Sequence, residues 1–111
     1  MGWTNYEGRG EQAAPTRILF WGDKPGERPH DFVREDIPRG DRQRLAQALR
    51  TGREVASYRG WANCRICGAH LGSRDMGGRG FVWPEKADHY LIEHDVWTPG
   101  CQALFDALGD V

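Results

Sequence analysis

Apolar residues occur along the chain in short groups, and the spacing within each group predicts one element of secondary structure. The short run 17–21, apolar after its first residue, is the first strand candidate, and the proline-rich, charged stretch 22–38 is expected as an irregular loop. A helix is predicted over 41–50, stopping at Gly52, and alternation over 54–61 predicts a second strand. The apolar face of the helix has the i, i+3, i+4 spacing of Leu45, Ala48 and Leu49.

The second half of the chain predicts a β-hairpin followed by a helix. Two short groups, 69–73 and 80–83, flank the glycine-rich stretch 75–78, which is expected as the turn between two strands. Pro84 stands where a helix would begin, because proline is favoured at the first helical position and acidic residues follow it. This helix is predicted over 85–94.

The chain has three cysteines, Cys64, Cys67 and Cys101. An odd count, with no export signal, argues against a disulfide framework. A redox Cys-x-x-Cys motif would be followed by a helix, whereas here Gly68 follows and no helical pattern does. Glycine admits a positive φ, so the segment instead predicts the tight turn of a zinc knuckle.

Two histidines complete a ligand set for zinc. The spacing Cys64-x2-Cys67-x21-His89-x4-His94 has the order knuckle, hairpin, helix that a two-cysteine, two-histidine zinc finger has. The gap is longer than the usual gap of about 12 residues, so a longer hairpin is expected. Two thiolates and two neutral imidazoles form the closed set typical of structural zinc, and zinc is the predicted cofactor.

The fourth ligand has alternatives. His89 and His94 are five residues apart, so on an ideal helix their side chains would point about 140° away from each other. Both can bind one ion only if the helix loosens near its end or if His94 lies just beyond it. Cys101 and His70 are the substitutes for His94.

The segment 58–99 resembles a family of small uncharacterised bacterial zinc-binding proteins. Its motifs are Cys-x-x-Cys-Gly, Gly-Ser-x-Asp, Val-Trp-Pro-Glu and His-Tyr-x3-His-x-Val. The residues that carry them here are Cys64, Cys67, Gly68, Gly72, Ser73, Asp75, Val82, Trp83, Pro84, Glu85, His89, Tyr90, His94 and Val96. The resemblance implies a zinc-stabilised domain and brings no activity with it.

These elements predict a small single domain of the α+β class. It joins a zinc knuckle, a β-hairpin and a helix, in ββα-like order, to an N-terminal strand and helix. Residues 1–15 are expected as a flexible arm and 16–111 as one zinc-stabilised domain, with the zinc segment at 58–98. Of 111 residues, 39% are hydrophobic and 28% charged, so the core is modest and gains from a metal. One or two helical turns are expected over 102–108.

The aromatic residues are assigned to two groups. Those near the predicted metal site are expected to form the core around it: Trp21, Trp61, Trp83 and Tyr90. Trp3 and Trp97 lie in less regular segments, where an exposed aromatic side chain would be an interaction anchor.

Charge is segregated along the chain although the net charge is only -1. Residues 37–65 carry seven arginines against two acids, whereas 75–111 carry seven acids against Arg79 and Lys86. Arginine pairs with carboxylates through a planar fork, so this segregation predicts a surface for a partner protein with an acidic face. Its residues are Arg39, Arg42, Arg44 and Arg50.

The function predicted from these features is a protein-interaction module with a structural zinc, and not an enzyme. A zinc-finger-like nucleic-acid binder using the Arg-rich segment 39–65 is the alternative, although acidic residues in the helix 85–94 would repel DNA. A metal-dependent hydrolase is the third possibility, against which stands the absence of an open water position in a four-ligand site. No membrane span is expected, and the predicted compartment is the cytoplasm.

Overall fold

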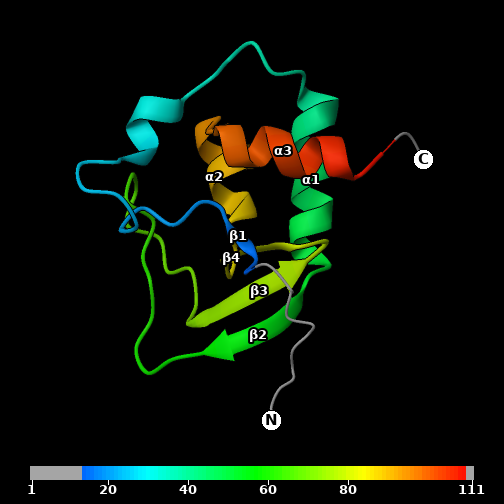
Figure 1. Cartoon of the computed structure of the whole chain (residues 1–111). Coiled ribbons are helices and arrows are strands. Elements are labelled where there is room, and N and C mark those ends of the chain that lie inside the picture. Colours follow the sequence, from blue (N-terminus) through cyan, green and yellow to red (C-terminus); the bar gives the residue numbers. More distant parts are fainter. Residues whose placement is uncertain (1–13, 110–111) are drawn as a thin grey trace, which may run out of the picture.

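The structure is a computed structural model, and it describes residues 14–109. In this part of the chain, three α-helices pack on one side of a four-stranded mixed sheet (Figure 1). The predicted class, a small α+β domain, is confirmed. Most of the arm predicted over 1–15, and Trp3 with it, lies outside the described residues.

The sheet has the strand order β1-β4-β3-β2. β1 pairs with β4 in parallel, and the other two pairings are antiparallel. In chain order the elements are β1 (Thr16–Arg17), the 3-10 helix η2 (Pro29–Phe32), α1 (Arg39–Arg50), β2 (Arg53–Ser57), β3 (Arg74–Gly78), β4 (Phe81–Pro84), α2 (Asp88–His94) and α3 (Pro99–Ala107).

The apolar face of α1 forms much of the core, as its spacing predicts. Leu45 and Leu49 are buried, and the indole nitrogen of Trp83 on β4 donates a hydrogen bond to the Leu49 carbonyl at 3.2 Å. This bond joins the end of α1 to the sheet. Both early strands are shorter than predicted, because 18–21 leaves the sheet after β1 and 58–61 leaves it after β2.

The hairpin forms, but its turn lies one segment later than predicted. The glycine-rich stretch 75–78 belongs to strand β3, and the turn consists of Arg79 and Gly80, with φ of 55° and 84°. Two consecutive positive φ angles characterise the tight hairpin turn that matches strand twist. Glycine suits position 77 of this strand because a Cβ there would lie only 3.0 Å from a methyl carbon of Val55, which is too close for ordinary packing.

The helix predicted over 85–94 is shorter than expected, because Pro84 ends β4 and does not begin α2. The Glu85 N–H donates to the Arg74 carbonyl at 2.8 Å, which continues the sheet pairing past the proline. Lys86 then turns the chain with a φ of 62°. Pro99, expected to interrupt the chain, instead starts α3, whose first turn is capped by the Thr98 hydroxyl.

One of the core aromatic predictions is wrong. Trp21, Trp83 and Tyr90 are buried as predicted, but Trp61 is 67% exposed. Trp97, which would have been an interaction anchor if it were exposed, is 3% exposed because it follows a bridge between Val96 and Val33 that carries it into the core.

Candidate metal centre

Four potential metal ligands converge between the knuckle and α2. One donor atom from each of Cys64, Cys67, His89 and His94 lies within 4.8 Å of all the others. The predicted alternatives for the fourth ligand, Cys101 and His70, are not part of this group. Cys101 is a buried residue of α3 with its thiol against Thr98, and the His70 ring lies 5.3 Å from the Trp61 ring in a tilted orientation.

The knuckle is a tight turn whose backbone is wrapped around the Cys64 sulfur. Gly68 adopts a φ of 80° and donates its N–H to the Cys64 carbonyl at 2.9 Å, which closes the tight turn. The N–H groups of Ile66 and Cys67 point at the Cys64 sulfur, at 3.3 and 3.5 Å. These contacts hold the Cys64 sulfur in a fixed position at the centre of the turn.

Two further contacts fix the knuckle relative to the domain. Asn63 and His70 form an isolated antiparallel bridge at its base. At its tip, the Arg65 N–H donates to the hydroxyl of Tyr90 on α2, at 2.9 Å. Contacts within the protein alone therefore position the knuckle relative to the helix that carries both histidines.

The end of α2 explains how histidines five residues apart can face one site. The Val96 N–H donates to the Tyr90 carbonyl six residues earlier, at 3.0 Å, and Asp95 between them adopts a left-handed φ of 56°, so the helix ends in a turn wider than an α-turn. The rings of His89 and His94 lie 5.0 Å apart, in edge-to-face orientation. His94 is the last residue of α2, so it lies at the boundary between the two expected cases, a loosened helix end and a histidine just beyond the helix.

The polar atoms of this cluster fit a metal ion. His94 Nε2 is buried and has no hydrogen-bond partner among residues 14–109, a costly state for a polar atom unless it binds something. Burial, and secondarily the neighbouring His89, lower the pKa of His94, which favours the neutral imidazole that binds metals. Cys67 Sγ lies 3.3 Å from His89 Nε2. A set of two sulfurs and two nitrogens is typical of structural zinc.

The predicted arginine surface is largely occupied by contacts within the chain. Arg42 is only 4% exposed and donates to the Arg34 carbonyl, so its prediction as a surface residue is wrong. Arg44 donates to the Gly109 carbonyl, and Arg50 forms an ion pair with Asp88 at 2.9 Å. Of the four, Arg39 is exposed and has no ion pair within the described part of the chain. Sequence spacing could not show these contacts, because the acceptors come from other elements.

The chain matches no protein-family model, no curated protein and no solved structure. Among the described helices, none is both long enough and apolar enough to cross a membrane.

Proposed function

We propose that this chain is a zinc protein whose metal is structural, and that the domain serves as a module that binds another protein. The observation that supports it is the closed donor set formed by Cys64, Cys67, His89 and His94. Four protein ligands satisfy the tetrahedral preference of zinc and leave no position for a reacting water. A structural role therefore fits the donor set better than hydrolysis does.

The position of the cluster indicates what such a metal stabilises. It would join the knuckle, which is followed by β3 and β4, to α2, which packs against α1 in the core. Residues 58–73 contain no helix and no ladder strand, so this long connection is held by local backbone bonds between its own two halves and not by a regular element. A zinc ion adds on the order of 10 kcal/mol in small zinc-dependent domains, enough to order it.

Membership of the small bacterial zinc proteins that segment 58–99 resembles is part of this proposal. The nucleic-acid alternative gains no support from the arginine pattern. Arg42, Arg44 and Arg50 are engaged with groups of the chain itself, which leaves few free cations on α1 to contact phosphates.

Native mass spectrometry of protein purified without added metal tests the proposal. We expect a mass corresponding to one zinc per folded chain, and its loss together with the folded charge-state distribution when a chelator is added. A folded chain with a metal-free mass would contradict the proposal.

A further inference from the structure

Exposed apolar side chains are concentrated on one short stretch. Among residues 14–109, three of the four large hydrophobic side chains that are exposed lie between Val55 and Trp61. They are Val55, Tyr58 and Trp61, exposed by 55, 59 and 67%. Tyr58 and Trp61 also line one groove, which makes this stretch a candidate surface for a partner.

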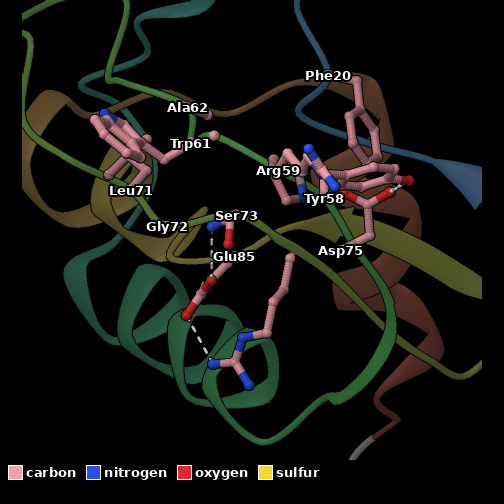
Figure 2. A pocket seen from close by; sticks show the side chains of 13 residues that line it. Phe20, Tyr58, Arg59, Trp61, Ala62, Leu71, Gly72, Ser73, Asp75 and Glu85 are labelled. Atoms are coloured by element: carbon pink, nitrogen blue, oxygen red, sulfur yellow. Dashed lines mark hydrogen bonds and ion pairs between the residues drawn. The ribbon is translucent and has the colours of Figure 1, made fainter.

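Two of these residues border a groove of about 300 Å³ (Figure 2). Trp61 and Leu71 lie at one end of it, and Tyr58 and Phe20 lie at the other. Its floor includes Gly72 and Ser73. We call this feature the Tyr58–Trp61 groove.

The backbone beside the groove has free hydrogen-bonding groups. Tyr58 donates to the Ser73 carbonyl at 2.9 Å and Ala62 to the Gly72 carbonyl at 2.8 Å, so the two chain segments are paired on both sides of 59–61. Between these bonds the segment bends outward at Gly60, which has a φ of 74°. No backbone bond is found for the N–H groups of 59–61 within the described chain. These donors can bind a peptide backbone.

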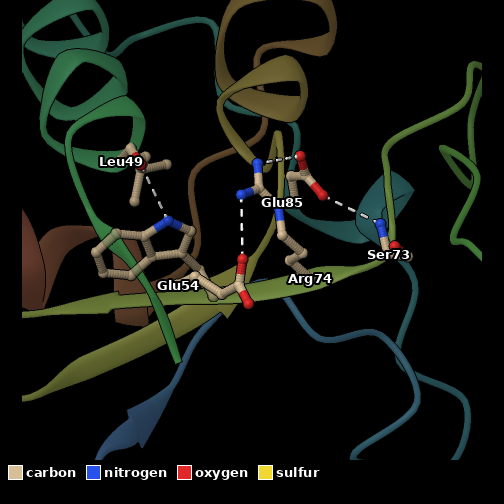
Figure 3. A network of polar contacts seen from close by, with 6 residues as sticks. Leu49, Glu54, Ser73, Arg74 and Glu85 are labelled. Carbon is tan, nitrogen blue, oxygen red and sulfur yellow. Dashed lines mark hydrogen bonds and ion pairs between the residues drawn. The ribbon is translucent and has the colours of Figure 1, made fainter. Parts of the chain in front are cut away.

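One charge in the groove lacks a partner. Arg74 forms ion pairs with both Glu54 and Glu85, at 3.2 and 2.7 Å (Figure 3). Asp75 accepts a hydrogen bond from the Tyr58 hydroxyl at 2.8 Å. Arg59, which lies between the two aromatic ends, has no ion pair with any residue that the structure describes.

We propose that the Tyr58–Trp61 groove binds a peptide segment of a partner protein in which a large apolar side chain stands next to an aspartate or glutamate. This inference rests on the proposed function and gives it a site and a ligand chemistry. The apolar side chain lies between the aromatic ends, and its acidic neighbour pairs with Arg59. A planar guanidinium at the rim of an aromatic groove suits a single carboxylate.

The charges favour this ligand over a nucleic acid. Arg59 and Arg74 are balanced by Asp75 and Glu85 among the residues that line the groove, so the lining as a whole carries no excess of positive charge. Binding to single-stranded nucleic acid needs a positively charged path along the backbone in addition to aromatic stacking. A peptide with a single carboxylate, in contrast, needs only one cation without an ion pair, and Arg59 is such a cation among the described residues.

The groove also depends on the metal centre. Leu71 donates to the Ala62 carbonyl at 2.9 Å, and the next bridge along this pairing, Asn63 with His70, forms the base of the knuckle. Zinc bound by the knuckle would therefore hold the Trp61 end in position. Peptide binding is expected to be lost when the zinc is removed.

A phage library of random heptapeptides, selected on the immobilised zinc-loaded chain, tests the inference. Parallel selections use Trp61→Ala and Arg59→Glu, with Arg79→Glu as the matched control because Arg79 is an exposed arginine of the hairpin turn, outside the groove. All variants are first checked for wild-type zinc content and thermal midpoint. We expect the wild type and Arg79→Glu to enrich peptides with a large apolar residue beside an acid. Synthetic peptides from this set should bind Trp61→Ala and Arg59→Glu at least about tenfold more weakly.

The other outcomes separate the groove from the wider function. Equal enrichment on Trp61→Ala would overturn the groove and leave the proposed module in place, because the peptides would bind elsewhere. No enrichment on any protein would contradict both. A competition assay separates the groove from a nucleic-acid site. If an oligothymidylate displaces a bound selected peptide at lower concentration than the unlabelled peptide does, the inference is overturned in favour of nucleic acid.

Discussion

The hydroxyl of Tyr90 accepts a hydrogen bond from the backbone N–H of Arg65, at 2.9 Å. Tyr90 is 2% exposed and belongs to the core, and Arg65 stands between the two cysteines of the knuckle. One buried side chain therefore joins the core directly to the loop that presents both sulfurs. The ring of Tyr90 also lies 6.1 Å from that of His89 and 6.4 Å from that of His94.

Substituting Tyr90→Phe should destabilise the domain while keeping its core packing. The Arg65 N–H would lose its partner in a part-buried position, a cost of about 1–2 kcal/mol in the free energy of unfolding. Chemical denaturation of the zinc-loaded protein measures this. Tyr58→Phe is the matched control, since its hydroxyl bonds to Asp75 at the surface, and an equal loss in both variants would contradict the role of Tyr90.

Two buried cysteines should respond differently to the same substitution. Cys64→Ser removes a proposed zinc ligand, so we expect loss of zinc and a drop of several kcal/mol in the free energy of unfolding. Cys101→Ser changes a thiol outside the cluster and should keep the zinc, at a cost of about 1 kcal/mol. Zinc content and denaturation curves decide the matter, and loss of zinc in Cys101→Ser would show that the ligand set is different.

The glycine at position 72 should be more sensitive than the glycine at position 60. Both adopt positive φ, 91° and 74°, so alanine is strained at either position. Only at Gly72 would the added Cβ also collide with the Glu85 carboxylate, whereas it meets nothing at Gly60. We expect Gly72→Ala to cost at least about 2 kcal/mol and Gly60→Ala about 1 kcal/mol. Similar thermal midpoints for the two variants would contradict this packing.

Acid should release the metal and destabilise the domain. Zinc binds thiolates and neutral imidazoles, whereas in the unfolded chain the cysteines bind protons below about pH 8.5 and the histidines below about pH 6.5. The unfolded state thus holds more protons than the zinc-bound state, and stability should rise with pH across this range. Burial lowers the pKa of His94, which keeps its imidazole neutral to lower pH than an exposed histidine.

A pH series of denaturation curves on the wild type and on Cys64→Ser measures this effect. The wild type should lose stability steeply between about pH 7 and pH 5, the range in which histidine protonates. Cys64→Ser, without zinc, should show a much flatter profile. The same steep profile in both proteins would exclude zinc release as its cause.

Local patterns in the sequence predicted the parts of the structure that depend on neighbouring residues. The helix around Leu45 and Leu49 follows from its periodicity, and the knuckle follows from Cys-x-x-Cys-Gly. From the sequence, His94 could join the site only on the condition that the helix loosens near its end or that His94 lies just beyond it. That condition is met by the left-handed Asp95, for which the sequence carries no strong signal.

The failed predictions, and the open one on Trp97, concern residues whose surroundings come from distant parts of the chain. Arg42 is buried because a carbonyl in the preceding loop accepts its guanidinium, with Asp95 nearby at 3.9 Å. Trp61 is exposed because its segment bends out of the sheet pairing, and Trp97 is buried because a strand-like bridge draws it inward. The aromatic side chain alone does not predict that Trp61 is exposed and Trp97 buried.

Zinc K-edge X-ray absorption on protein purified without added metal tests the central claim most directly. The account predicts one zinc per chain with two sulfur neighbours at about 2.3 Å and two nitrogen neighbours at about 2.0–2.1 Å. Three sulfurs and one nitrogen would place Cys101 in the site in place of a histidine. That result, a shell dominated by oxygen, or a protein that folds with no zinc would contradict the assignment of Cys64, Cys67, His89 and His94.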